Sequence, residues 1–304
     1  MNNRVTNSMM ARTVLYDAGN AAHRLRTTER KLSSGKELDR PSDDPYGVSR
    51  AITLRGDIEG TRQFTRNAQE AISWQDVSDS ALDAISSVTL RARELLLRGA
   101  SDTGGQIARD AIAAEIDQLV DAAKEHADAT YGNRFVFAGT ATTTRPYVVG
   151  GADTYAGDAG TISRQIGPGV VLAINVRSVD LLGNGQLAND GLLLDNLRDV
   201  AQHLRGGTAA DVSLLRGVDL RALDANLDKL NQSRALIGAG TNRLLSALDR
   251  LGEVDVATTK LLSDVEDTDM AGRMVDFSIQ KAAYGAALKA GANIVQVSLL
   301  DFLR

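Results

Sequence analysis

Serine, lysine and glycine lie at spacings that two kinds of catalytic or binding loop use. Ser33 and Lys36 match the S-x-x-K pattern, in which a lysine activates a nucleophilic serine at a buried helix start. Here the pair follows a helical stripe that ends at Leu32, so we interpret Gly35 as a helix C-cap followed by a polar turn. The segment is not a phosphate-binding P-loop either, because Glu37 replaces the required serine or threonine. Neither acyl-transfer nor nucleotide chemistry is predicted here.

A second glycine-rich segment, residues 183–188 (GNGQLA), matches the loose dinucleotide-binding pattern G-x-G-x-x-A. It follows a predicted strand, but the chain beyond it is helical, so no parallel sheet is available to build such a site. We interpret it as a return from a β subdomain to helices. Asp153 and Asp158 could ligate a cation, but they lack EF-hand spacing, and we expect solvated loop acids.

No other residues of the sequence are candidates for metal or covalent catalysis. His23, His126 and His203 are far apart and form no H-E-x-x-H arrangement, and the sequence contains no cysteine. His126 falls on an apolar helical face, where we expect it to be packed or partly buried. No nucleophile, base and orienting acid lie at a workable spacing, so the sequence predicts a protein that is not an enzyme and carries no cofactor or metal.

Composition restricts the remaining classes of function. Of 304 residues, 43% are apolar, 24% are charged and only 4% are aromatic, which favours long packed helices over an enzyme core rich in rings. The formal net charge of -5 supplies no basic surface, so neither nucleic acid nor an anionic membrane is an expected partner. The sequence shows neither a signal-peptide core nor 18 consecutive apolar residues, so export would require another route.

Leucine periodicity predicts one long helix most strongly. Between Leu220 and Leu251, eight of ten positions spaced alternately three and four apart are apolar, the exceptions being Arg234 and Thr241. This is the seam of a coiled coil or bundle helix. We expect Asp211 to be its N-cap, because it follows a loop of two glycines and a threonine.

Two more bundle helices are predicted upstream. One runs over residues 45–97, with Asp44 as its cap, Pro45 in the first turn and Gly99 closing the far end. The other follows the loop at residues 101–105. One face of that helix is expected to carry Ile112, Ile116, Leu119, Ala123 and His126.

Helical periodicity stops at Tyr131, and the following segment is rich in glycine, threonine and valine. Residues 161–166 and 170–176 read as strands separated by a Gly-Pro-Gly turn, which predicts a hairpin. Leu172, Ile174 and Val176 would face one side of it. A small β subdomain is therefore predicted between the helices.

Both ends of the chain carry apolar stripes with helical spacing. In the N-terminal stripe, Asp17 and Thr28 interrupt the apolar positions. We infer that the two ends pair with each other and with neighbouring subunits, while completion of an intramolecular core remains the alternative. The stripes comprise Met10, Val14, Ala21, Leu25 and Leu32 at the first end, and Met270, Met274, Phe277, Tyr284, Leu288, Val295 and Phe302 at the second.

Three groups of residues resemble signatures of one family. Residues 32–36 (LSSGK) and the turn Ser42, Asp43, Asp44 and Pro45 resemble the signature near the start of flagellins and flagellar junction proteins. Residues 135–140 (FVFAGT) and 298–303 (SLLDFL) look like two motifs of hook-associated protein 3. The chain thus resembles the hook-associated protein 3 group of the flagellin family. Glu37 and Pro41 depart from the usual residues at their positions, which bears on the shape of the turn.

The resemblance implies a mainly α fold, in which the N- and C-terminal segments form a long-helix bundle or coiled coil with a small inserted β subdomain. Residues 1–43 and 265–304 would be the axial terminal helices, 44–130 and 188–262 the bundle helices, and 131–187 the β subdomain. Terminal helices exposed in the monomer would bury their stripes against neighbours, so that ordering is coupled to assembly. The implied interface comprises Met10, Val14, Leu25, Leu32, Phe277, Tyr284, Leu288, Val295 and Phe302.

The resemblance also implies a role and partners. The chain would be a structural adaptor at the extracellular hook-filament junction, exported by the flagellar type III apparatus with an export chaperone. It would self-associate in a ring and contact hook-associated protein 1 and flagellin. Three alternatives stay open: flagellin itself, a coiled-coil signalling or scaffold protein, and an enzyme whose site lies in the β subdomain.

Overall fold

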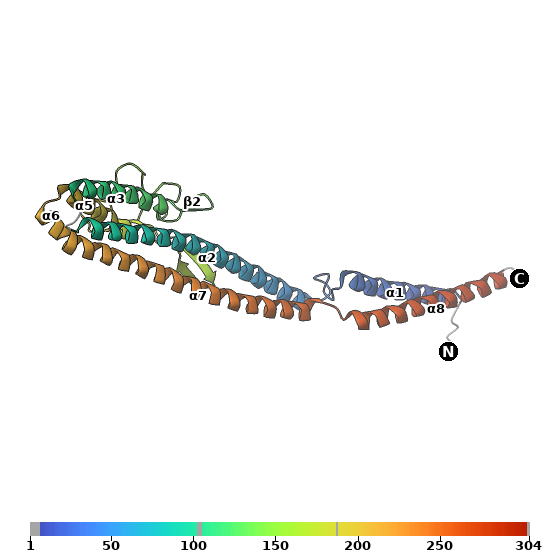
Figure 1. Cartoon of the computed structure of the whole chain (residues 1–304). Coiled ribbons are helices and arrows are strands. Elements are labelled where there is room, and N and C mark those ends of the chain that lie inside the picture. The colour runs from blue at the N-terminus through green and yellow to red at the C-terminus, as the bar shows by residue number, and fades with distance from the viewer. Residues whose placement is uncertain (1–6, 102–104, 187, 303–304) are drawn as a thin grey trace. The chain divides into compact units, whose positions relative to one another are not determined.

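The computed structural model describes residues 7–101, 105–186 and 188–302, and it confirms a mainly α-helical chain with a small inserted β subdomain (Figure 1). Contacts divide the chain into two compact units. The terminal unit comprises Met1–Gly60 and Val254–Arg304, and the central unit comprises Thr61–Glu253. Within the described ranges, no helix combines the length and the apolar composition that crossing a membrane requires.

The terminal unit contains helix α1 (Asn7–Ser34) and helix α8 (Met270–Phe302), which lie side by side (Figure 1). Gly35 ends α1 as predicted. Its φ is 70°, and its backbone N–H donates to the Lys31 carbonyl at 2.9 Å, which is the geometry of a left-handed C-cap.

Helix α2 (Pro45–Gly99) begins where the sequence predicted and includes Gly99, two residues beyond the predicted end at residue 97. Asp44 caps it, because Asp44 Oδ1 accepts the Tyr46 N–H at 3.0 Å. Pro45 occupies the first turn, where its missing N–H would have had no helical partner. Helix α3 (Gln106–Ala127) confirms the third predicted helix.

The leucine seam forms helix α7 (Leu220–Glu266), as predicted. The start of this helical run differs from the prediction. Thr208, not Asp211, is the N-cap, and the two form a capping box in which each side chain accepts the other's backbone N–H. Between the cap and α7 lie helix α6 (Ala209–Leu214) and a π-helical turn, η1 (Leu215–Asp219). Asp211 was misassigned because an acid suits both the cap and the third helical position.

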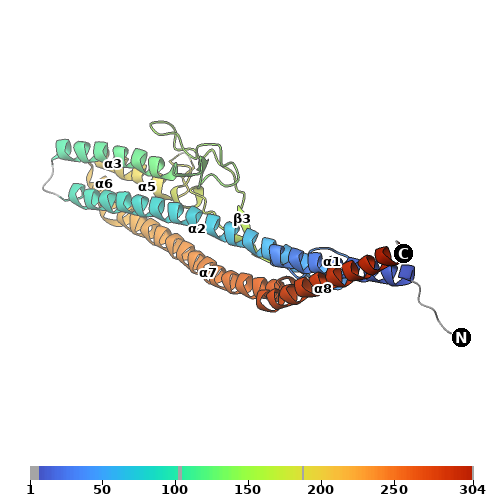
Figure 2. The same cartoon turned by 90° about the vertical axis from the view of Figure 1, so that its right-hand side faces the viewer.

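Helices α4 (Val179–Leu182) and α5 (Leu193–Gly206) return the chain from the insert to the bundle. α5 packs against α3, and the two run side by side in both views (Figures 1 and 2). One core cluster unites these helices with α2 and α7. Its fully buried members include Ala68, Trp74, Leu82, Ile85, Leu96, Ile116, Val120, Leu193, Leu197, Leu204, Leu223 and Leu244.

Two antiparallel hairpins form the β subdomain. Strands β3 (Ser163–Gly167) and β4 (Val170–Ala173) confirm the predicted hairpin, and both are shorter than predicted. Strands β1 (Thr130–Tyr131) and β2 (Arg134–Phe135) were not predicted. The turn between them is Gly132–Asn133, with φ values of 54° and 63°. Tight two-residue hairpin loops favour positive φ at both positions.

The motif at residues 135–140 forms the base of the β subdomain. Val136, Phe137 and Ala138 are fully buried. Gly139 has a φ of 68°, and a Cβ at this position would overlap Asp158, so only glycine fits. Val136 and Phe137 belong to the same core cluster as residues of the helices, so the motif packs the subdomain against them.

Candidate assembly surface

The helices α1 and α8 pair antiparallel. Thr28 Oγ1 donates to Gln280 Oε1 at 2.8 Å near one end of the pair. Towards the other end the helices approach closely, because a Cβ added to Gly291 would lie 3.0 Å from Val14 Cγ1. The terminal segments therefore pair with each other, as the stripes indicated.

The predicted interface residues occupy three kinds of position. Val14, Leu25, Leu32, Phe277 and Tyr284 are partly buried. Leu288 is 49% exposed. The side chains of the other three, Met10, Val295 and Phe302, lie outside the described part of the structure.

Several exposed apolar side chains on these helices were not in the predicted interface set. On α1, Leu15 and Tyr16 are 73% and 71% exposed, and on α8, Val275 and Ile279 are 59% and 62% exposed. Covering apolar side chains this exposed would be favourable, because it removes their apolar surface from water. A search for one stripe per helix missed them. The sequence feature that would have revealed them is that apolar residues lie on more than one face of each helix.

The family-signature turn sets the start of α2. Besides the cap at Asp44, the Asp43 side chain accepts the Arg40 N–H at 3.0 Å, and the Asp43 N–H donates to the Arg40 carbonyl at 2.9 Å. Ser42 and Pro45 are exposed. Asp44 thus caps the helix, and Asp43 closes the turn and also lies 3.9 Å from Arg30 Nη2 of α1.

Glu37 joins α1 to the start of α8. It receives Lys31 Nζ at 2.5 Å, Thr268 Oγ1 at 3.0 Å and Arg273 Nη2 at 2.9 Å. Burial alone would raise the pKa of Glu37, but the hydrogen bonds from Lys31 and Thr268 and the charges of Lys31 and Arg273 lower it below its usual value. An acid at this position is therefore accommodated by two cations around it.

Glu266, at the end of α7, is a second carboxylate surrounded by cations, and it is more deeply buried than Glu37. Its side chain is 2% exposed and pairs with Lys36 and Arg55. Burial raises the pKa of Glu266, and the hydrogen bonds and charges of Lys36 and Arg55 outweigh that effect and lower it. The backbone is joined here too, since the Glu37 N–H donates to the Glu266 carbonyl at 2.7 Å.

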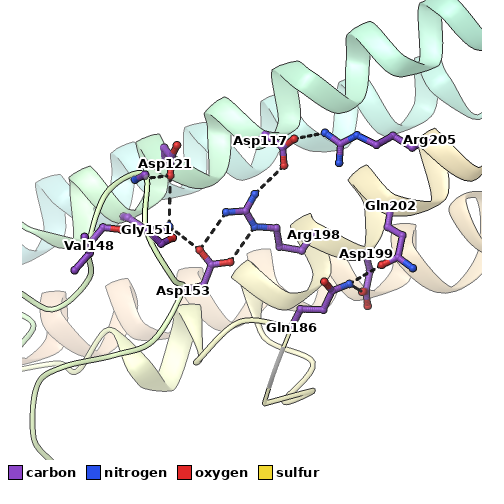
Figure 3. A network of polar contacts seen from close by, with 12 residues as sticks. Asp117, Asp121, Val148, Gly151, Asp153, Gln186, Arg198, Asp199, Gln202 and Arg205 are labelled. Atoms are coloured by element: carbon purple, nitrogen blue, oxygen red, sulfur yellow. Dashed lines mark hydrogen bonds and ion pairs between the residues drawn. The ribbon is translucent and has the colours of Figure 1, made fainter.

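A network of charges fastens the insert to α3 and α5 in the central unit (Figure 3). Lys124 is fully buried, and its Nζ lies 2.6 Å from Asp153 Oδ1 and 3.0 Å from the Gly151 carbonyl. Arg198 binds the same Asp153 carboxylate through Nε at 2.9 Å and Asp117 through Nη1 at 2.8 Å (Figure 3). Arg205 pairs with the other oxygen of Asp117.

The two acids considered as cation ligands are both occupied by protein donors. Asp153 is 11% exposed, so the expectation of a solvated loop acid is wrong for it. Burial raises the pKa of Asp153, but Arg198 and Lys124 together lower it. Asp158 accepts the Thr140 hydroxyl and the backbone N–H groups of Thr140 and Gly160. Among the residues that the structure describes, no three potential ligands gather around a metal site.

His126 and His203 serve packing and pairing, whereas His23 is exposed on α1. His126 is partly buried, as expected, beside a groove between α2 and α3. His203 Nδ1 lies 2.7 Å from Asp219 Oδ2 of η1. Burial raises the pKa of Asp219, against the opposing effect of His203. The pair links α5 to the π-helical turn.

Comparison with known families identifies two matching regions. The family model described as the bacterial flagellin N-terminal helical region matches residues 5–142, and the model of the bacterial flagellin C-terminal helical region matches residues 220–303. Residues 143–219, which contain most of the insert together with α4, α5, α6 and η1, lie between the two matches.

Individual relatives match along most of the chain. The flagellar filament 31.3 kDa core protein of Treponema maltophilum is 28% identical over 279 residues, which is 90% of this chain and 90% of the relative. Flagellin of Bacillus subtilis (strain 168) is 28% identical over 284 residues, covering 90% of this chain and 91% of the relative.

Solved structures share the fold. Flagellar hook associated protein-3 from Legionella pneumophila superimposes with a TM-score of 0.60 at 13% identity, covering 70% of this chain and 99% of that one. FlgL of Xanthomonas campestris gives a TM-score of 0.58 at 16% identity, covering 69% of this chain and 99% of that one.

Proposed function

The chain belongs to the bacterial flagellin family, and from this premise we propose that it is the adaptor that joins the flagellar hook to the filament. Membership of this family makes it a structural component of the flagellum outside the cell and not an enzyme.

The observation that carries the proposed mode of assembly is the exposed apolar surface of α1 and α8. Tyr16 and Ile279 are 71% and 62% exposed although both helices are already paired with each other. Packing against neighbouring subunits would cover these side chains, at a gain of roughly 25 cal/mol per Å² of apolar area. The helices would thus join copies of the chain into a ring.

Two features support the junction over the filament. The motif at residues 135–140, which resembles hook-associated protein 3, forms the buried base of the insert through Val136, Phe137 and Ala138. The fold is also shared with solved structures that carry the names hook associated protein-3 and FlgL. Because those structures are less than 20% identical to this chain, they support the proposal through fold alone.

The second candidate is flagellin, the filament subunit. The sequence relatives favour it, since they are named flagellin or filament core protein at 28% identity over 90% of this chain. The two candidates share the terminal helices and differ in their neighbours. The junction protein would contact hook-associated protein 1 on one side and flagellin on the other.

Export through the flagellar type III apparatus with a dedicated chaperone completes the proposal. The absence of cysteine from the sequence suits a chain that folds after export without disulfide formation. Folding and incorporation would then be coupled at the tip of the growing structure.

Deletion of the gene tests the proposal. Hooks and filaments are scored by electron microscopy, and flagellin in the medium is measured by immunoblotting. Bare hooks with abundant flagellin in the medium are expected, because export continues while the filament cannot be seated. Bare hooks with no flagellin anywhere would identify the chain as the filament subunit, and unchanged filaments in a strain without a paralogue would overturn both candidates.

A further inference from the structure

Two polar side chains interrupt the leucine seam of α7 within the central unit. The apolar members Leu223, Leu230, Ile237 and Leu244 are buried, whereas Arg234 is a cation at a seam position. The second interruption is Thr241. A repeat of leucines offers similar packing whenever two helices shift by one turn or one heptad, so the apolar seam alone distinguishes poorly between registers.

Arg234 meets a row of carboxylates on α2. Its Nε lies 2.9 Å from Asp79 Oδ1, and its Nη1 lies 2.6 Å from Asp83 Oδ1. Asp76 lies one turn further towards the start of α2 and lines the same open groove of 470 Å³ as Asp79, Arg234 and Thr241. An arginine displaced by one turn would therefore find Asp76 and Asp79 in place of Asp79 and Asp83. The ion pair alone leaves a second register open.

Gln75 removes this ambiguity. Its side chain is buried, with 4% of the residue exposed, and its Oε1 accepts the Thr241 hydroxyl at 3.0 Å. A Cβ added to Gly240 would lie 2.8 Å from Gln75 Nε2, so the amide fits against a residue without a side chain. A shift of one turn would place Gln75 against Ile237 or Leu244. A buried amide without a partner is unfavourable, so only the observed register satisfies it.

We propose that the Gln75–Thr241 and Asp79–Arg234 pairs are a register-selecting device, which chooses one alignment of α2 and α7 among those that the leucine seam permits. The partly buried pair of Arg93 Nε and Asp224 Oδ1, at 2.6 Å, belongs to the same alignment further along both helices. These pairs would select the helix register without adding to stability, because apolar side chains at these positions would pack at least as well.

Spin labels can measure the register directly, because the sequence contains no cysteine that would compete for labelling. Leu90 of α2 and Ser246 of α7 are both exposed, so Leu90→Cys and Ser246→Cys accept labels without disturbing the core. The observed pairing separates the two positions by about 30 Å along the helix axes, at 1.5 Å per residue. The labelled parent should give one narrow distance by pulsed electron paramagnetic resonance.

The decisive variant combines Gln75→Leu, Thr241→Leu and Arg234→Leu in the labelled chain. It should keep its helix content, while its distance distribution splits or broadens with components displaced by about 5 Å or about 10 Å, which correspond to one turn and one heptad. Fluorescence of Trp74, the single tryptophan, reports whether the core is intact, since this side chain is 1% exposed. An unchanged single distance with an intact core would overturn the proposal.

A second variant keeps the seam polar, in case the first fails to fold. Asp79→Asn and Asp83→Asn together with Thr241→Val leave Asp76 as the carboxylate for Arg234. The label distance should then lengthen by about 5 Å, because α7 moves one turn towards the start of α2. A folded variant with the parental distance would contradict the mechanism. The control Arg91→Leu removes the Arg91–Glu115 pair outside the seam and should leave the distance unchanged; a split distance there would also contradict it.

Discussion

Thr28 of α1 donates a hydrogen bond to Gln280 of α8, 252 positions later in the chain. Thr28 is 5% exposed, so the hydroxyl is shielded from water and depends on this partner. In the sequence Thr28 interrupts the apolar stripe of the first helix. The structure explains the interruption as one half of a polar pair that aligns the two terminal helices.

Replacing Thr28 with valine should destabilise the terminal unit by about 1 kcal/mol, because the shape is kept while Gln280 loses its donor. Hydrogen exchange of the α1 and α8 amides would measure the loss. Thr13→Val is the matched control, since Thr13 is exposed and its hydroxyl donates to the Met9 carbonyl of its own helix. Equal losses in the two variants would show that the effect is one of helix propensity and not of the pair.

Replacing Leu288 with aspartate should lower incorporation into flagella by at least about tenfold, because assembly would bury an unpaired charge. Incorporation is measured by immunoblotting of purified flagella from a deletion strain carrying the variant. Leu236→Asp is the control, since Leu236 is 73% exposed on α7, outside the terminal helices. Normal incorporation of Leu288→Asp would remove this residue from the proposed interface.

Acid should loosen the terminal unit through Glu37 and Glu266. Both carboxyl groups have a pKa below the ordinary 4.5 in the folded chain. Their stabilising contribution is therefore complete above about pH 4.5 and is lost as the pH falls through the lowered values. After correction for the slower intrinsic exchange at low pH, the protection factors of the amides at the start of α8 should fall over that window.

The variant Glu266→Gln separates this effect from general acid unfolding. It should be less stable than the parent at pH 7 and should lose less stability between pH 5 and pH 3, because one of the responsible groups no longer titrates. Parallel pH profiles for parent and variant would show that Glu266 does not contribute.

Replacing Lys124 with methionine should destabilise the central unit by about 3 kcal/mol, because Asp121 and Asp153 lose a buried cation and two carbonyls lose their donor. Urea unfolding followed by Trp74 fluorescence measures the change. Arg205→Met serves as the control. Arg205 is 49% exposed at the edge of the same network, and its loss should cost less than about 1 kcal/mol.

A similar loss in both variants would mean that the network responds to net charge alone. A larger loss for Lys124→Met would instead localise the attachment of the insert to the buried lysine. Trp74 is a suitable reporter because its ring packs edge-on against Tyr131 of β1, with centroids 6.2 Å apart.

Local signals in the sequence predicted much of the helical framework. Asp44, Pro45 and Gly99 marked both ends of α2 because capping, proline placement and termination depend on adjacent residues. The β3–β4 hairpin was predicted for the same reason. Thr208 was missed as a cap because Asp211 could fill that position equally well from sequence alone.

Features that depend on distant residues escaped sequence analysis. Lys124 was not predicted to be buried, since lysine is rarely found inside proteins unless a partner such as Asp153 comes from another element. The π-helical turn ending at Asp219 leaves no periodic trace of its extra residue per turn. The exposed Leu15 and Ile279 were missed because a single stripe was assigned to each terminal helix.

The pairing of Thr28 with Gln280 also determines when, during synthesis of the chain, α1 can pair with α8. Because Gln280 lies 252 positions after Thr28, α1 gains its partner only after residues near position 280 are present. A chain that stops before α8 would contain the bundle helices and the insert but no paired terminal helices. Under the proposed mode of assembly, only a chain that includes both α1 and α8 would present the surface that they form jointly, so a truncated subunit would fail to incorporate.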